Sequence, residues 1–324
     1  MKILIIGGAG MVGRKLAERL ATDGRLGDKE ISALTLVDVV APAKPAAAKF
    51  AVKLLTGDLS VVGEAAKLVA DRPDVIFNLA AIVSGEAEQD FDKGYRINLD
   101  GGRYLLEAAR AAGHKPRLVF TSSIAVFGAP FPDAIGDEFV HAPLTSYGTQ
   151  KAICELLLSD YTRKGFVDGV GIRLPTICVR PGKPNKAASG FFSNIMREPL
   201  AGLDAVLPVS ESVRHWHASP RAAVGFLLHA ATIDGAKLGP RRNLSMPGVS
   251  VTVGEQIAAL GKVAGDKVVA RIRREPDPFI EQIVAGWPRN FDPKRAVSLG
   301  FRADKSFEDI IRVHIEDELG GKIA

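Results

Sequence analysis

Cysteine is scarce in this chain, and its scarcity excludes two kinds of architecture. Cys154 and Cys178 are the only two cysteines among 324 residues. Two cysteines cannot build a disulfide framework, and neither stands at the spacing of a metal-ligand motif. We therefore expect a protein of a reducing compartment, the cytoplasm, without a metal centre. His215 and His217 lack a third ligand nearby in sequence and do not change this expectation.

Long hydrophobic runs are also missing. No apolar stretch approaches the ~20 residues that a membrane-spanning helix needs. The N-terminal segment MKILIIGGAG is apolar only briefly and then breaks into glycines. It also lacks the small-residue cleavage site of a secretory signal. We expect no membrane partner and interpret this segment as a first strand.

Runs of a single charge sign are absent as well. The 42 Lys and Arg residues outnumber the 37 Asp and Glu residues, which gives a formal net charge of +5. The two signs are interspersed, so the basic stripe typical of nucleic-acid binding is lacking. We expect no nucleic-acid partner. A small anionic substrate suits the charge equally well.

The first half of the chain alternates strand-like and helix-like patterns. A helical stripe runs over 91–112, and continuous apolar segments occur at 2–7, 33–38, 52–58, 74–81, 117–123 and 169–174. Buried strands separated by helices predict a parallel sheet covered on both faces, a doubly wound, Rossmann-like α/β fold. This alternation of strand-like and helix-like patterns ends after Leu174. We expect a first domain over 1–174, with later contributions from about 215–246, and a smaller, mixed C-terminal lobe over 175–324.

A glycine-rich segment, IIGGAGMVG, joins the first strand to a helix. Glycines at this spacing allow a tight turn and let backbone amides approach a pyrophosphate, whose charge is favoured at a helix N-terminus. Asp38 ends the second strand, at the number of residues after the glycines where such folds carry an acid. A carboxylate there accepts hydrogen bonds from the hydroxyls of the adenosine ribose. The same carboxylate would repel a 2′-phosphate, so NAD is favoured over NADP. The alternative is that Asp38 merely ends a strand. The predicted contacts in the loop are Gly7, Gly10, Met11, Val12 and Gly13.

Two later loops offer further cofactor contacts. Asp58 and Leu59, in TGDL after the third strand, are placed to meet the adenine. Ala80 and Ala81, after the fourth strand, are small enough to let a cofactor lie against the backbone. Each of these features alone is common in loops. They indicate a cofactor site only together with the glycine-rich segment that precedes them. We predict that the first domain binds NAD.

Four polar residues form a candidate catalytic group. Ser122 and Ser123 end the fifth strand, at the sheet edge where open α/β folds bind ligands. Tyr147 and Lys151 lie one helical turn apart and share a face. A tyrosine pKa of about 10 is too high for a base at neutral pH, and a nearby ammonium favours the phenolate. A serine can then bind the substrate oxygen while the tyrosine takes its proton during hydride transfer. In isolation the pair is better explained as a surface tyrosine packed over a lysine stem.

The motifs together resemble the extended short-chain dehydrogenase/reductase family. They are GGAGMVG, GDL, NLAA, INLDG, FTSSIAVFG and SYGTQKAICE, with a C-terminal signature in FDPKRAVSLGF. The resemblance implies that the catalytic residues are Ser123, Tyr147 and Lys151. It also implies that Asn98 lines the cofactor cleft and that Pro175 and Thr176 touch the nicotinamide end. Members of the family commonly dimerise through helices, so we expect a homodimer.

Departures from the family pattern bear on the substrate. Many relatives act on nucleotide sugars, but the segment VRHWHASPR has lost two acidic positions, and Phe127 stands where sugar-nucleotide epimerases commonly carry tyrosine. Basic residues remain, and the fork of arginine suits a carboxylate. The alternative is that several of them are solvated surface charges. These basic residues are Arg173, Arg180, Lys183, Lys186 and Arg214.

The region from Leu174 to Leu200, with VRHWHASPR, resembles a sugar-acid branch of the family. That branch oxidises the 2-hydroxyl of D-erythronate to 2-oxo-D-erythronate with NAD. We therefore predict NAD-dependent oxidation of a small sugar acid. An alternative is a nucleotide-sugar epimerase or dehydratase with tightly bound NAD. A non-catalytic dinucleotide sensor is a third, although such proteins typically lose the tyrosine or lysine retained here. The predicted substrate contacts are Ser122, Ser123, Arg180, Arg214 and His217.

Overall fold

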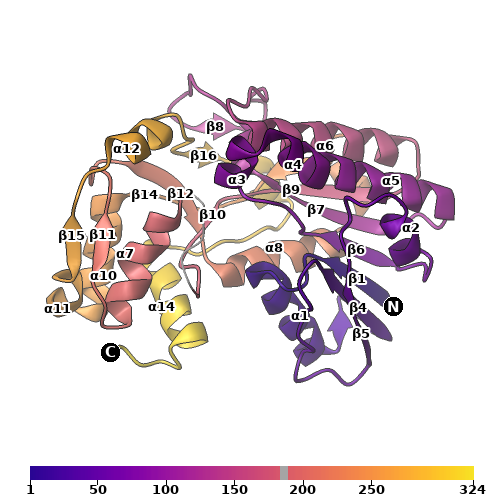
Figure 1. Ribbon diagram of the computed structural model, residues 1–324, viewed down its shortest axis with the longest axis horizontal. Helices are drawn as coiled ribbons and strands as arrows, with labels where there is room; N and C mark the ends of the chain where they lie inside the picture. The colour runs from indigo at the N-terminus through magenta and orange to yellow at the C-terminus, as the bar shows by residue number, and fades with distance from the viewer. Residues whose placement is uncertain (183–188) are drawn as a thin grey trace. The chain divides into compact units, whose positions relative to one another are not determined.

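The computed structural model describes residues 1–182 and 189–324, which pack as two compact units (Figure 1). The first unit comprises Met1–Val126, Thr145–Arg173 and Val224–Ser245. The second comprises Phe127–Leu144, Leu174–Ala223 and Met246–Ala324. The boundary expected at residue 174 separates a cofactor-binding lobe from a substrate-binding lobe. The packing of the chain does not show which unit binds which ligand, so this boundary stays a prediction.

A seven-stranded sheet forms the centre of the first unit, in the order β13-β9-β7-β6-β1-β4-β5. The pairs of β1 with β4 and β6, β4 with β5, β6 with β7, and β9 with β13 are all parallel. The predicted Rossmann-like α/β fold class is therefore confirmed. The strands are β1 (Lys2–Ile6), β4 (Ala33–Asp38), β5 (Ala51–Thr56), β6 (Val75–Asn78), β7 (Arg117–Ser123), β9 (Asp168–Leu174) and β13 (Asn243–Ser245).

Helices cover both faces of this sheet. Figure 1 shows α5 and α6 along one face and α1 along the other. Leu105 and Leu106 of α5 and Leu158 of α6 share a buried core with Ile76 and Leu118 of the strands. The continuous apolar sequences of β1, β6, β7 and β9 follow from this covering, because a strand buried on both faces needs no polar side. The edge strand β5 is mostly exposed. The helical segments are α1 (Met11–Asp23), α2 (Glu64–Val69), α3 (Ser84–Gln89), α4 (Phe91–Gly94), the π-helix η1 (Tyr95–Asp100), α5 (Gly101–Ala112), the 3-10 turn η2 (Ile124–Val126), α6 (Ser146–Arg163), α9 (Gly235–Leu238) and the later part of α8 (Pro220–Thr232). A short antiparallel pair, β2 (Arg25–Leu26) and β3 (Lys29–Glu30), follows α1.

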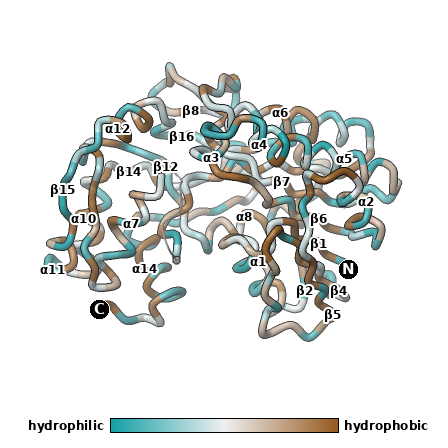
Figure 2. Tube along the Cα trace, viewed as in Figure 1, coloured by the Kyte–Doolittle hydropathy of each residue, from teal (hydrophilic) through white to brown (hydrophobic). Residues whose placement is uncertain are grey.

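The second unit is built from smaller sheets and its own helices. β10 (Thr176–Ile177), β12 (Arg214–Ala218) and β14 (Val249–Thr252) form one sheet. Its core includes Phe192, Ile195, Leu260 and Phe307, and hydrophobic stretches of the chain run along α10 (Figure 2). The other paired strands are β11 (Ala205–Leu207) with β15 (Ile272–Arg274) and β8 (Ile135–Gly136) with β16 (Phe291–Asp292). The helices are α7 (Gly190–Leu200), α10 (Val253–Ala264), α11 (Asp266–Val269), α12 (Pro278–Ala285), α13 (Lys294–Ser298) and α14 (Phe307–Glu318).

None of the helices in the described part of the chain combines the length and apolar character needed to cross a bilayer.

Candidate active site

The loop after β1 requires glycine on two grounds. Gly7 has φ +90°, a conformation that side chains rarely adopt, and a Cβ there would lie 2.8 Å from the backbone nitrogen of Ala80. Its N–H donates to the carbonyl of Val37 at 2.9 Å. Gly7 therefore brings the ends of three strands, β1, β4 and β6, close together at one edge of the sheet.

The first turn of α1 packs against the same loop. A Cβ on Gly13 would lie 2.1 Å from the carbonyl oxygen of Gly7, so no larger residue fits. Gly10 is the N-cap, and within the described residues no side chain caps this end and no acid occupies its first turn. The helix start thus keeps its partial positive charge and its backbone donors for an anion. Met11 and Val12 supply two of those donors.

Asp38 ends β4 beside this loop. Its Oδ2 accepts a hydrogen bond from the N–H of Ala9 at 3.0 Å. The side chain is half-buried, and its other lone pairs stay available for the two hydroxyls of a ribose. A loop that admits no Cβ at Gly7 or Gly13, an uncapped helix start and a tethered acid together fit a dinucleotide.

Asp58 is held by its own loop. Its Oδ1 accepts from the N–H and the hydroxyl of Ser60, at 2.9 and 2.6 Å. The guanidinium of Arg96 lies 3.8 Å from Oδ2. Leu59 is buried in the core against the helices. Asp58 is therefore fixed in place, and the positive charge of Arg96 partly balances its negative charge.

Asn98 connects the loop after β6 to α6. It lies in η1 and is 4% exposed. Its Oδ1 accepts from the N–H of Ile82 at 2.9 Å, and its Nδ2 donates to Oε1 of Gln150 at 2.8 Å. The loop that contains Ala80 and Ala81 is thereby held close to the helix of Tyr147. Sequence reasoning missed Gln150, because its partner is 52 residues away.

Tyr147 and Lys151 lie on one face of α6, as predicted from their spacing. The Nζ atom of Lys151 lies 5.6 Å from the centroid of the Tyr147 ring. It donates a hydrogen bond to the carbonyl of Thr121 at 2.9 Å, and the residue is 2% exposed. Burial lowers the pKa of Lys151 from 10.5 to about 8, a shift that Cys154 and Glu155 oppose. The ammonium form therefore predominates at neutral pH.

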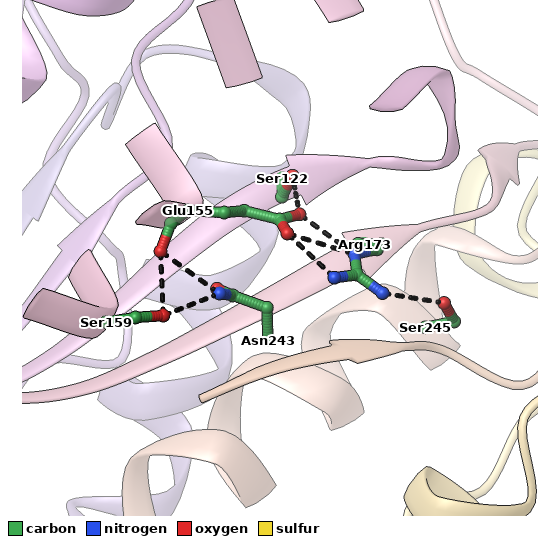
Figure 3. Close-up of polar contacts among 6 residues, drawn as sticks. All are labelled: Ser122, Glu155, Ser159, Arg173, Asn243 and Ser245. Atoms are coloured by element: carbon green, nitrogen blue, oxygen red, sulfur yellow. Dashed lines mark hydrogen bonds and ion pairs between the residues drawn. The ribbon is translucent and has the colours of Figure 1, made fainter. Parts of the chain in front are cut away.

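The two serines at the end of β7 have different surroundings. The hydroxyl oxygen of Ser123 accepts from the N–H of Ala125 at 3.1 Å, and the residue is half-buried. Ser122 is 3% exposed, and its hydroxyl donates to Oε1 of Glu155 at 2.5 Å (Figure 3). Glu155 in turn binds Arg173. Sequence reasoning missed Glu155, although it follows Lys151 by one helical turn.

The second unit holds the remaining predicted contacts. The hydroxyl of Thr176, after the buried Pro175, lies 2.7 Å from Nε2 of His215. His217 is fully buried, with its Nε2 2.9 Å from Nε2 of Gln256. Burial lowers the pKa of His215 to about 4 and holds the pKa of His217 well below its usual value.

The basic candidates mostly have partners within the chain. Arg180 donates to the carbonyl of Ile177 and the hydroxyl of Ser189, each at 3.0 Å. Arg214 lies 3.1 Å from Glu255. The fork of Arg173 already binds a carboxylate of the chain itself. Lys183 and Lys186 lie outside the described residues. Over residues 1–182 and 189–324, no three His, Cys, Asp or Glu side chains gather into a metal-binding group.

Comparisons with known proteins agree with this geometry. A family model described as the NAD dependent epimerase/dehydratase family matches residues 3–232. D-erythronate dehydrogenase from Cupriavidus necator is 48% identical over 321 residues, 98% of each chain. D-erythronate dehydrogenase from Haemophilus influenzae is 44% identical over 319 residues, 98% of this chain and 100% of that one. A crystal structure described as the nucleoside-diphosphate-sugar epimerase from Agrobacterium tumefaciens has a TM-score of 0.98 and 69% identity, over 100% of this chain and 96% of that one. The chain therefore belongs to the NAD dependent epimerase/dehydratase family, and NAD is its cofactor.

Proposed function

We propose that this enzyme oxidises the 2-hydroxyl of D-erythronate, giving 2-oxo-D-erythronate and NADH. The observation that carries the proposal is the near full-length identity, 48% and 44%, to two proteins named D-erythronate dehydrogenase. The pairing of Tyr147 with a buried lysine supports the reaction class, because hydride transfer from an alcohol needs a base for its proton.

The first unit supplies the proposed cofactor contacts. The amides that follow Gly10, at Met11 and Val12, would bind the pyrophosphate, while Gly7 and Gly13 let the backbone approach it. Asp38 would accept hydrogen bonds from the adenosine ribose. We place the remaining contacts, by sequence pattern and position, at Asp58, Leu59, Ala80, Ala81, Asn98, Pro175 and Thr176. When bound, NAD supplies the acceptor for the hydride.

Tyr147 is the proposed base. Its phenolate takes the proton from the oxygen of the 2-hydroxyl as the hydride leaves C2, so the alcohol becomes a ketone by loss of one proton and one hydride. The ammonium of Lys151 lies near the ring and favours the phenolate. One of its three N–H groups is committed to Thr121, and we assign the others to the phenolate and a ribose hydroxyl.

Ser123 is the proposed donor to the reacting oxygen. Its hydroxyl accepts from the N–H of Ala125. A hydroxyl can accept and donate at once, so its own hydrogen can bind the oxygen that becomes the ketone. Ser122, Arg180, Arg214 and His217 remain proposed substrate contacts on the sequence pattern alone.

A second candidate function comes from the structure described as a nucleoside-diphosphate-sugar epimerase, which is 69% identical to this chain. An epimerase returns the hydride to its substrate, so it releases no net NADH. Net NADH release therefore separates the two functions.

The test is NADH formation from NAD with C4 to C6 sugar acids, including D-erythronate and L-threonate, with UDP-glucose in parallel. Steady NADH release with D-erythronate supports the proposal. Conversion of UDP-glucose without NADH release, and silence with the acids, would replace it with the epimerase. A heat-inactivated sample corrects for background absorbance.

We also propose that the enzyme acts in the cytoplasm as a homodimer that uses α6. Leu156 supports an interface, since it is 67% exposed on this helix. Light scattering on the wild type and on Leu156→Asp tests the assembly. A wild-type monomer would contradict it.

A further inference from the structure

A buried ion pair lies directly beneath the end of β7 (Figure 3). The carboxylate of Glu155 is fully buried, and Arg173 is 8% exposed. Arg173 donates from Nε to Oε1 at 3.0 Å and from Nη2 to Oε2 at 2.8 Å, a bidentate contact. The hydroxyl of Ser122 donates to Oε1 at 2.5 Å. The pair is thus bound to β7, α6 and β9 at once.

Two successive turns of α6 hold two successive residues of β7. Lys151 donates to the carbonyl of Thr121, and one turn later Glu155 accepts from Ser122. These contacts directly precede Ser123. The position of that serine relative to Lys151 therefore depends on both contacts.

The same turn of α6 is held from its other side. The amide of Asn243, on β13, donates to the carbonyl of Glu155 at 3.1 Å and to the hydroxyl of Ser159 at 3.0 Å (Figure 3). A Cβ on Gly171 would lie 1.9 Å from Oδ1 of Asn243, so β9 leaves room for this amide. The backbone and the side chain of Glu155 are both fixed.

Stability does not explain why charges occupy this place. Burying an ion pair costs desolvation energy, and well-packed apolar residues often replace such a pair without loss of stability. The charged and titratable groups near Lys151 are Tyr147, Cys154 and Glu155 on α6, with Arg173 behind Glu155. Burial raises the pKa of the Cys154 thiol to about 11, so the thiol is neutral. Glu155 therefore carries the negative charge one helical turn from Lys151 that opposes the lowering of the Lys151 pKa by burial.

We propose that the Glu155–Arg173 pair is a positioning element of the hydride-transfer site, which aligns Ser123 through Ser122 and holds Lys151 as an ammonium. This inference rests on the proposed function only for its kinetic readout. Neither residue touches substrate or cofactor in this proposal.

The kinetic test uses Glu155→Leu/Arg173→Met, which removes both charges of the pair. We expect wild-type NAD affinity and KM, with kcat lowered by about 10²-fold, the cost of a misplaced catalytic group. Ser122→Ala, a smaller change, should lower kcat in the same direction. Folded variants that keep wild-type kcat would overturn the proposal.

The matched control is Arg117→Gln/Asp168→Asn/Arg242→Gln, which removes every charge of the ion-pair group around Asp168. Arg117 and Asp168 form an ion pair of 2.8 Å at the opposite ends of the same two strands, β7 and β9. We expect wild-type kcat in this variant. An equal loss of kcat in the control would mean that any ion pair involving these strands matters, and would also overturn the proposal.

A readout without substrate separates this inference from the proposed function. The titration of Lys151 can be followed by NMR with isotope-labelled lysine, with the signal assigned through Lys151→Met. We expect the Lys151 midpoint to fall in Glu155→Gln, which removes the negative charge and keeps the positive charge of Arg173, and to stay near the wild-type value in the control. A moved midpoint supports the inference even if no sugar acid is oxidised. An unmoved midpoint overturns it even if D-erythronate is the substrate.

Discussion

The ammonium nitrogen of Lys151 lies 2.9 Å from the carbonyl oxygen of Thr121, two residues before Ser123. This hydrogen bond joins α6 to the end of the central strand β7 inside the core. The lysine is therefore fixed by the fold before any ligand arrives. Its charge is held in an apolar setting, with the Phe120 ring 4.8 Å from the nitrogen.

Lys151→Met should abolish activity and leave the protein as stable as the wild type at pH 7, or more stable. The pKa of Lys151 falls from 10.5 to about 8 on burial, which corresponds to a stability cost on the order of 3 kcal/mol below pH 8. Between pH 8 and 10.5 the unfolded chain binds more protons, so wild-type stability rises relative to the variant. Urea unfolding at pH 7 and 10 measures this difference. If the difference in unfolding free energy between Lys151→Met and the wild type does not narrow at pH 10, the lowered pKa of Lys151 is contradicted.

Tyr147→Phe should lower kcat by about 10²–10⁴-fold, the usual contribution of a general base, with little change in NAD affinity. Tyr161→Phe is the control, because Tyr161 lies on the same helix and hydrogen-bonds Glu107 instead. Steady-state kinetics and NAD titration measure both variants. Near-normal turnover in Tyr147→Phe would remove tyrosine from the mechanism.

Asp38→Ala should weaken NAD binding by about tenfold or more, since hydrogen bonds to a charged group contribute about 1.5–3 kcal/mol. NADP binding should change less, because the variant also removes a repulsive charge. Asp38→Asn is the control for the loop, as it keeps an acceptor for the N–H of Ala9. Calorimetry with both cofactors measures the preference. An unchanged ratio of NAD to NADP affinity would mean that Asp38 only ends a strand and does not bind the ribose.

Gly13→Ala should destabilise the first unit by about 1–3 kcal/mol, the usual cost of overpacking. Its Cβ would lie 2.1 Å from the carbonyl oxygen of Gly7. Gly10→Ala is the control in the same loop, because its Cβ would meet that oxygen at 3.3 Å. Thermal unfolding without cofactor compares the two. Equal stability of both variants would mean that the loop has room for a side chain.

The fold class was predictable because its signal is local. Six of the seven central strands are continuous apolar segments, and each pattern spans enough residues to be recognised. The seventh, β13, was missed because Asn243–Ser245 is too short to show a period. The expected helix over 91–112 is interrupted by η1, where Asn98 turns toward Gln150. That contact joins residues 52 positions apart, so no local sequence pattern predicts it.

The candidate site was predictable only in part, for the same reason. Gly7, Tyr147 and Lys151 stand in motifs whose spacing carries the chemistry. Glu155 follows at one helical turn, but its meaning depends on Arg173, which pairs with it across two elements. The family resemblance is confirmed by the matching family model.

The place of β13 in the sheet has a consequence for synthesis. It pairs with β9, yet residues 175–242 are translated between them. At 5–20 residues per second the ribosome needs roughly 3–14 seconds for that stretch. During this interval β9 is an open edge, the kind of strand that recruits other chains. A nascent chain stalled before Asn243 would therefore be a substrate for chaperones, and translation speed over 175–242 becomes part of how this enzyme folds.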